Sequence, residues 1–288
     1  ARRQRQMCIR DRLSYIDALI KEKQFDNAKK VLEQAKNQGL EEEKLNTLEA
    51  KLASINQPEN INSLSPSQQQ LSELNKYYQK GRHDDAEKLA TSITEQFPNH
   101  QVGWKVLGAL FAQKGMKDEA LNANQRAIPI APQDSEDHNN LGITYKALGR
   151  LGEAEVSLRQ AIALKPDFAE AHGNLGNLLQ DLGRLDEAEA SYAQAVVLKP
   201  DYAEARSNMS NLLRELGRLD EAEASCRQAI ALKPDFAEAH LNLGKTLLEL
   251  GKLDEAEASY RQTIALKPDF TEAHNNLGSL LRALGRLE

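Results

Sequence analysis

The sequence has few aromatic residues, only two cysteines and no excess of positive charge. Aromatic residues make up 5% and hydrophobic residues 40% of its 288 positions, which is little for one large layered core and favours an elongated fold with many small contacts. The net charge of -6 argues against nucleic acid as a partner, because such binding needs clustered Lys and Arg. Cys8 and Cys226 cannot form a disulfide framework. No apolar run reaches the length of a membrane span, so we expect a cytoplasmic protein with no membrane partner.

The first twelve residues differ in composition from the rest of the chain. Residues 1–12 (ARRQRQMCIRDR) hold five of the 37 Lys and Arg residues and no helical pattern. They resemble a translated sequencing adaptor, and we expect them to be foreign to the protein, with a basic tail or a transit peptide as the alternatives. Without them the chain carries a net charge of -10. Because the sequence also stops inside a repeated motif, we expect it to be a fragment of a longer protein.

A period of 34 residues organises the chain from residue 101 onward. The near-identity of residues 169–202 and 237–270 is typical of stacked supersecondary units. Within each copy, apolar residues recur at helical spacing twice, with a break between them, which predicts a hairpin of two amphipathic helices. The expected repeats, numbered internally from position 1, are 101–134, 135–168, 169–202, 203–236, 237–270 and the truncated 271–288.

The pattern weakens before residue 101. Residues 67–100 predict a divergent repeat whose first helix starts at Ser65-Pro66-Ser67-Gln68, with Pro in the first turn. Residues 56–66 are polar and predict a linker. Residues 13–55 predict a leader hairpin followed by one more helix.

Residues that start and stop helices agree with the period. Gly183 is expected to end a first helix because it tolerates positive φ, and Pro200 to follow a second helix because it cannot continue one. Asp167 and Glu170 are spaced as a capping box at the start of a first helix. The same spacing recurs at the start of the second helices, as in Asp186 and Glu189.

The repeat resembles the signature of the tetratricopeptide repeat (TPR) family. In the repeat from residue 135, the matching residues at positions 7, 8, 11, 20, 24, 27 and 32 are Leu141, Gly142, Tyr145, Ala154, Leu158, Ala161 and Pro166. Asn124 and Ser210 depart from it, at an aromatic and a glycine position. The resemblance implies an all-α fold, namely a right-handed superhelical solenoid of antiparallel helix hairpins that binds a protein or peptide.

Stacking of such hairpins puts the first helices on the concave wall, so positions 2, 5, 6, 9, 12 and 13 are expected to meet a ligand. Position 6 is Asn in five consecutive repeats, and an amide can pair with both the N–H and the C=O of an extended peptide. The row resembles the asparagine array in the TPR arm of O-linked N-acetylglucosamine transferases. Recent duplication is the alternative explanation. The predicted peptide-binding residues are Asn140, Asn174, Asn208, Asn242, Asn276, Asn177, Asn211, Lys146, Gln180 and Arg214.

Other candidate sites are weaker. The acids at position 2, such as Glu170, are expected to cap helices, and where exposed they favour a basic or neutral partner over an acidic one. The carboxylate clamp of chaperone-binding TPR proteins is rejected, because Glu170 and Asn174 stand where that clamp has Lys and Arg. Cys226 lies in a core aromatic slot and is expected to be a buried apolar residue rather than a nucleophile. The position-4 histidines, expected to pack in the family's Trp slot without a metal, are His138, His172, His240 and His274.

The sequence thus predicts a protein- or peptide-binding scaffold, with no active site or cofactor. No phosphate-binding loop or Ser/His/Asp set is visible. The alternative is the substrate-recruiting N-terminal arm of a larger glycosyltransferase, sulfotransferase or methyltransferase. That alternative rests on the near-identical GRLDEAEASY copies, which resemble bacterial TPR proteins often fused to such domains.

Overall fold

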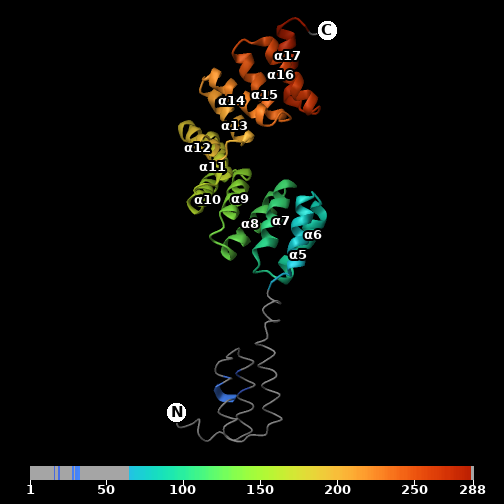
Figure 1. Ribbon diagram of the computed structural model, residues 1–288, viewed down its shortest axis with the longest axis vertical. Helices are drawn as coiled ribbons and strands as arrows, with labels where there is room; N and C mark the ends of the chain where they lie inside the picture. The colour runs from blue at the N-terminus through green and yellow to red at the C-terminus, as the bar shows by residue number, and fades with distance from the viewer. Residues whose placement is uncertain (1–15, 17–18, 20–27, 29, 33–64, 287–288) are drawn as a thin grey trace. The chain divides into compact units, whose positions relative to one another are not determined.

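The computed structural model describes residues 16, 19, 28, 30–32 and 65–286, which are drawn in colour in Figure 1. The adaptor-like segment 1–12 lies outside the described residues, as do most of the expected leader 13–55 and most of the expected linker 56–66. By its contacts the chain divides into two compact units. One comprises Ala1–Arg82 and Ser92–His100, and the other His83–Thr91 and Gln101–Glu288.

The first long helix of the described part begins at a capping box. Helix α5 spans Gln68–Gln79 and α6 spans His83–Gln96. The Gln70 backbone N–H donates to Ser67 Oγ at 3.2 Å, and the Ser67 N–H donates to Gln70 Oε1 at 2.9 Å, which satisfies two backbone donors that the helix cannot. Pro66 therefore lies before the cap, so its expected place in the first turn is wrong.

The remaining helices alternate between a first and a second helix of each hairpin (Figure 1). The first helices are α7 (Gln101–Gln113), α9 (Ser135–Ala147), α11 (Ala169–Asp181), α13 (Ala203–Glu215), α15 (Ala237–Glu249) and α17 (Thr271–Ala283). The second helices are α8 (Lys117–Ile130), α10 (Leu151–Leu164), α12 (Leu185–Leu198), α14 (Leu219–Leu232) and α16 (Leu253–Leu266). Each second helix packs against the first helix of its own hairpin and of the next, and consecutive first helices from α7 to α15 also touch. Lys245 of α15 forms an ion pair with Glu272 of α17. The first helices therefore share one continuous surface.

Glycine and proline end the helices as predicted. Helix α11 stops at Asp181, and Gly183 has a φ of 71°, a left-handed conformation that costs glycine little. The turn is closed by the Arg184 N–H, which donates to Leu179 O at 2.9 Å. Helix α12 stops at Leu198, two residues before Pro200.

The predicted capping boxes are wrong. Helices α11 and α12 begin after Phe168 and Arg184, and neither cap residue accepts a side-chain hydrogen bond. Asp167 lies one residue too early to cap α11, and Asp186 lies inside the first turn of α12, where its charge still favours the positive helix end. Helix α9 differs because position 34 of the preceding repeat is Asp134. Its Oδ1 accepts the N–H of Glu136 at 2.9 Å and of Asp137 at 3.2 Å.

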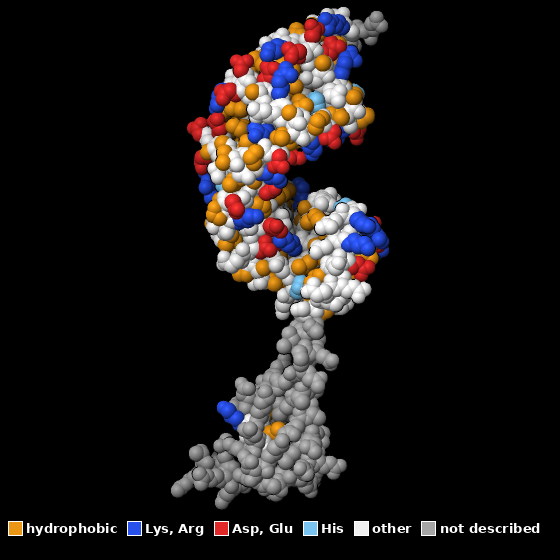
Figure 2. All heavy atoms as spheres, in the orientation of Figure 1, with side chains coloured by type: hydrophobic (Ala, Val, Ile, Leu, Met, Phe, Trp, Pro, Cys, Tyr) orange, Lys and Arg blue, Asp and Glu red, His pale blue; other side chains and the backbone are white. Residues whose placement is uncertain are grey.

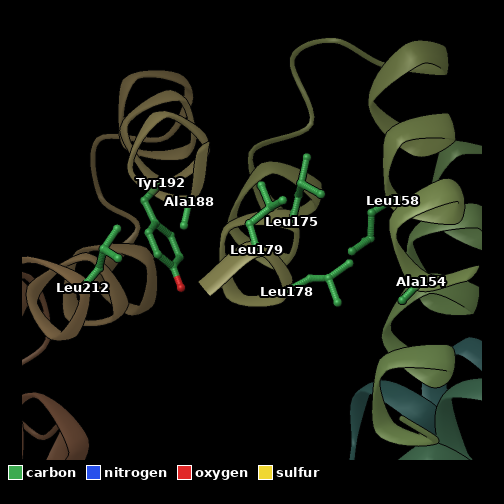
Figure 3. Packing of buried hydrophobic residues seen from close by; sticks show 8 residues of the cluster. All are labelled: Ala154, Leu158, Leu175, Leu178, Leu179, Ala188, Tyr192 and Leu212. Atoms are coloured by element: carbon green, nitrogen blue, oxygen red, sulfur yellow. The ribbon is translucent and has the colours of Figure 1, made fainter. Parts of the chain in front are cut away.

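The core between hairpins is built mainly from leucine and alanine, with a fully buried tyrosine at position 24 of two repeats. Figure 3 shows Tyr192 of α12 between α11 and α13, with Leu158 of α10 on the far side of α11. Tyr192 is fully buried, and a Cβ added to Gly176 would come within 2.7 Å of its ring. Position 8 must therefore stay small wherever position 24 carries a tyrosine.

One repeat changes both members of this close contact. Ser210 replaces the glycine at position 8, and Cys226 replaces the aromatic residue at position 24. Both side chains are fully buried, and burial raises the pKa of the Cys226 thiol. The structure confirms that Cys226 is a buried core residue, and it explains why a serine fits at position 210. None of the described helices is long and apolar enough to cross a membrane.

Candidate polypeptide-binding surface

The exposed faces of α9, α11, α13, α15 and α17 adjoin one another, and we call this surface the first-helix wall. All of the predicted binding residues lie on these helices, because positions 6, 9 and 12 fall within each first helix. They are Asn140 and Lys146 on α9, Asn174, Asn177 and Gln180 on α11, Asn208, Asn211 and Arg214 on α13, Asn242 on α15 and Asn276 on α17.

Three asparagines of the position-6 row connect neighbouring first helices. Their Nδ2 atoms each donate to the preceding repeat, from Asn174 to Asn139 Oδ1 at 2.9 Å, from Asn208 to Asn177 Oδ1 at 2.8 Å and from Asn242 to Ser207 Oγ at 3.0 Å. Asn242 is only 6% exposed. These side chains stabilise the stack, a role that the sequence did not reveal.

Three other asparagines of the wall are uncommitted. Within residues 65–286, the side chains of Asn140, Asn211 and Asn276 take no hydrogen bond, and all three are partly exposed. The residue at position 5 of the preceding repeat accounts for two of these cases: Lys105 precedes Asn140 and Leu241 precedes Asn276, and neither offers an acceptor. Each free amide can still give donors and an acceptor to a ligand.

A second row of contacts joins position 12 of one first helix to position 13 of the next. The contacts are Lys146 Nζ to Asp181 Oδ2 at 3.0 Å, Gln180 Nε2 to Glu215 Oε2 at 3.0 Å and Arg214 Nη1 to Glu249 Oε1 at 2.7 Å. Lys146, Gln180 and Arg214 therefore already have partners within the wall. A ligand would compete with, or add to, these contacts.

The hydroxyl group of a core tyrosine contacts side chains of the first-helix wall. The Tyr192 hydroxyl donates to Asn177 Oδ1 at 2.6 Å and lies 3.1 Å from Gln180 Oε1, and burial raises the pKa of Tyr192. The equivalent Tyr260 has Lys245 and Leu248 at those two positions. Its buried hydroxyl has no partner within the described chain, and burial raises the pKa of Tyr260 to about 12. A tyrosine at position 24 together with amides at positions 9 and 12 is the sequence signal for the Tyr192 contact.

Three of the acids at position 2, Glu170, Glu204 and Glu238, have structural partners at the other end of their repeat. Lys199 Nζ lies 2.7 Å from Glu170 Oε1 and 5.0 Å from the centre of the Tyr202 ring. The ammonium group holds the pKa of Glu170 below its usual value. Lys233 makes the equivalent ion pair with Glu204 at 3.0 Å. Each such lysine ties the end of a second helix to the start of its first helix.

The position-4 histidines contact backbone carbonyl groups. In each case Nε2 lies close to the carbonyl oxygen of the proline six residues earlier. The pairs are His138 and Pro132 (3.0 Å), His172 and Pro166 (3.0 Å), His240 and Pro234 (3.0 Å), and His274 and Pro268 (2.8 Å). Arg206 takes this position in the repeat from residue 203 and donates to Pro200 O at 3.1 Å. The side chains thus satisfy a carbonyl group in the loop between hairpins.

The second helices are joined by ion pairs of their own. A base at position 16 meets an acid at position 21 of the preceding repeat, as in Arg184–Glu155 at 2.8 Å and Arg218–Glu189 at 2.7 Å. Figure 2 shows Lys/Arg and Asp/Glu side chains intermixed over the C-terminal hairpins. Charges on the second helices are largely matched within the chain, so a charge preference is better sought on the first-helix wall.

Helix hairpins that stack at a period of 34 residues, with a small residue at position 8 against a buried side chain at position 24, define a TPR protein. A family model described as the C-terminal domain of cilia and flagella-associated protein 70 matches residues 67–278. Because this match covers more than half of the chain, the chain belongs to that family. No curated protein matches it.

Solved structures show the same fold. The chain is 27% identical to TTC0263, a thermophilic TPR protein of Thermus thermophilus, with a TM-score of 0.57 over 64% of this chain and 100% of that one. PilW, a type IV pilus biogenesis factor, gives a TM-score of 0.65 at 20% identity over 74% of this chain and 100% of its own. A chain of the APC/C hetero-tetramer Cut9–Hcn1 gives 0.69 at 19% identity over 74% of this chain. This chain spans 42% of that one. The expected TPR solenoid is confirmed.

Proposed function

We propose that this TPR scaffold holds an extended polypeptide along its first-helix wall. Membership in a TPR family supports protein–protein interaction as the general role. The observation that favours the wall as the site is its supply of uncommitted amides, Asn140, Asn211 and Asn276. Such amides can pair with the N–H and C=O groups of a passing backbone and therefore accept many side-chain sequences.

We further propose that the bound polypeptide is basic or neutral. The wall carries the carboxylates of Asp181, Glu215 and Glu249 at position 13. An acidic ligand would meet these groups at close range, and like charges across an interface are unfavourable.

The uncommitted amides allow a test that leaves the stack intact. A triple variant, Asn140→Ala with Asn211→Ala and Asn276→Ala, removes no hydrogen bond within residues 65–286. We expect unchanged far-UV circular dichroism and at least about tenfold weaker peptide binding, since one hydrogen bond contributes ~0.5–1.5 kcal/mol. The probe is a fluorescein-labelled uncharged peptide of Ser, Thr, Val and Pro, about fifteen residues long because neighbouring helices are about 10 Å apart and an extended chain advances ~3.3 Å per residue.

A matched control changes amides on the second helices instead. Gln160, Gln194 and Gln262 are exposed at position 26 of their repeats, and their replacement by Ala together should leave the affinity unchanged. Equal affinity of the asparagine triple variant and the wild type, measured by fluorescence polarisation, would contradict the proposal. Asn174, Asn208 and Asn242 are unsuitable for this purpose because their loss would also weaken the stack.

A further inference from the structure

The row of contacts between positions 12 and 13 is regular except at its middle. The outer two contacts are ion pairs, Lys146–Asp181 and Arg214–Glu249. In the middle contact the carboxylate of Glu215 meets the neutral amide of Gln180. The wall therefore carries one carboxylate whose charge its neighbour does not offset.

Glu215 has no cationic partner in the described part of the chain. Glu215 is exposed, and within residues 65–286 no Lys or Arg nitrogen forms an ion pair with it. Gln180 is held from the other side, because the Tyr192 hydroxyl lies 3.1 Å from its Oε1. The amide nitrogen of Gln180 consequently stays directed at the carboxylate, and Glu215 keeps its second oxygen for another donor.

Two asparagines extend this acceptor group along α13. Asn208, Asn211 and Glu215 are three and four residues apart, so they lie in one stripe on the helix surface. The Asn208 Nδ2 already donates to Asn177, and its Oδ1 accepts no hydrogen bond from residues 65–286. The Asn211 amide has no partner in the described part of the chain.

We propose that Glu215, Asn208 and Asn211 form a subsite for a lysine or arginine side chain of the polypeptide bound on the wall. Both of these side chains carry only donors, and a charge-assisted hydrogen bond to a carboxylate is the strongest contact that this stripe can offer them. The subsite rests on the proposed function, because the wall must first hold an extended chain. It adds a residue preference at one place along that chain.

The experiment compares two peptides that differ at one residue. Both are the labelled peptide of Ser, Thr, Val and Pro, one with a central Arg and the other with a central Gln. The 288-residue chain should bind the Arg peptide about threefold more tightly at low ionic strength, as expected for an exposed ion pair. The advantage should shrink in high salt because exposed charges are screened.

The repeat itself suggests the variant that removes the preference. In Gln180→Lys, the new ammonium should pair with Glu215 as Lys146 pairs with Asp181, and the two peptides should then bind equally. Tyr192 keeps its 2.6 Å bond to Asn177 Oδ1, so we expect the Gln180→Lys variant to fold like the wild type. Glu215→Gln should also abolish the preference, because it removes the carboxylate itself. Asp220→Asn, which removes an exposed carboxylate from a second helix, is the control that should retain it.

The possible results separate the two proposals. Equal affinity of the wild type for the two peptides would overturn the subsite and leave the wall as a polypeptide-binding surface. A preference lost in Asp220→Asn as well would also overturn the subsite, since net charge alone would then explain it. Failure of the wild type to bind either peptide would overturn the proposed function and the subsite with it.

Discussion

The exchange of Gly and an aromatic residue for Ser210 and Cys226 predicts strong coupling between positions 8 and 24. In two other repeats the added Cβ of a position-8 residue would lie 2.7 Å from the Tyr192 ring and 2.5 Å from the Tyr260 ring. Real Cβ atoms do not approach other atoms so closely. A tyrosine at position 226 would therefore collide with Ser210, and overpacking of this kind costs about 1–3 kcal/mol.

The double variant Ser210→Gly with Cys226→Tyr should recover the stability that Cys226→Tyr alone loses. Ser210→Gly alone removes the hydrogen bond from Ser210 Oγ to Ser207 O, which is 2.6 Å long, and adds the ~0.5–1 kcal/mol cost of glycine in a helix. Combined with Cys226→Tyr, it opens the space that the ring needs. The new hydroxyl can then donate to Asn211, as Tyr192 donates to Asn177. We expect a coupling energy of about 2 kcal/mol between the two substitutions.

The stability of a repeat array is a sum of local terms, so a local measurement is needed. Hydrogen exchange of the α13 and α14 backbone amides reports the opening of this hairpin, and urea unfolding followed by circular dichroism reports the whole stack. Gly244→Ser should be destabilising because of Tyr260, whereas Gly278→Ser should be neutral because no atom lies within 4 Å of its added Cβ. A Cys226→Tyr variant as stable as wild type, or a double variant no more stable than that single variant, would refute the steric explanation.

Two further predictions concern polar groups inside the stack. Asn242→Ala should lower the free energy of unfolding by about 1–2 kcal/mol, since it breaks a buried bond to Ser207, and Asn276→Ala should change it by less than ~0.5 kcal/mol; urea unfolding of both variants checks this. Burial raises the pKa of Asp137, so the folded chain binds this proton more tightly than the unfolded chain and loses stability as the pH rises above the unfolded value of about 4. Asp137→Asn keeps an acceptor for Gln101 but has no group that titrates. Its melting temperature relative to that of the wild type should therefore increase as the pH rises above about 4.

Features fixed by single residues could be predicted from the sequence, whereas those fixed by a neighbour one repeat away could not. Gly183 ends α11 because its own backbone tolerates positive φ. The capping boxes failed because the helix start depends on position 34, where Phe168 replaces the polar residue that caps α9. Spacing alone does not show which of two adjacent residues becomes the cap.

In the candidate site, too, the sequence predicted the residues but not the contacts that they make. The sequence identifies Asn at position 6 but not what it contacts, because its partner lies on the preceding first helix. Asn174 comes after a repeat with a polar Asn139 at position 5 and bonds to it. Asn208 comes after a repeat with Gly173 at that position, which has no side chain, and bonds to Asn177 at position 9 instead.

Positions 5 and 9 of the preceding repeat together therefore decide which asparagines of the row are left for a ligand. Where position 5 is polar and short, as at Ser207, the next asparagine bonds to it. Where neither position offers an acceptor, as at Leu241 and Lys245, the next asparagine stays free. The row keeps one residue type while its neighbours vary, so five identical side chains divide into structural and available ones. Duplication alone would explain why the asparagines are identical. If the wall binds a peptide, however, replacing an uncommitted asparagine should weaken peptide binding without lowering the free energy of unfolding. Asn276 and Asn242, compared in both assays, separate the two roles within one row.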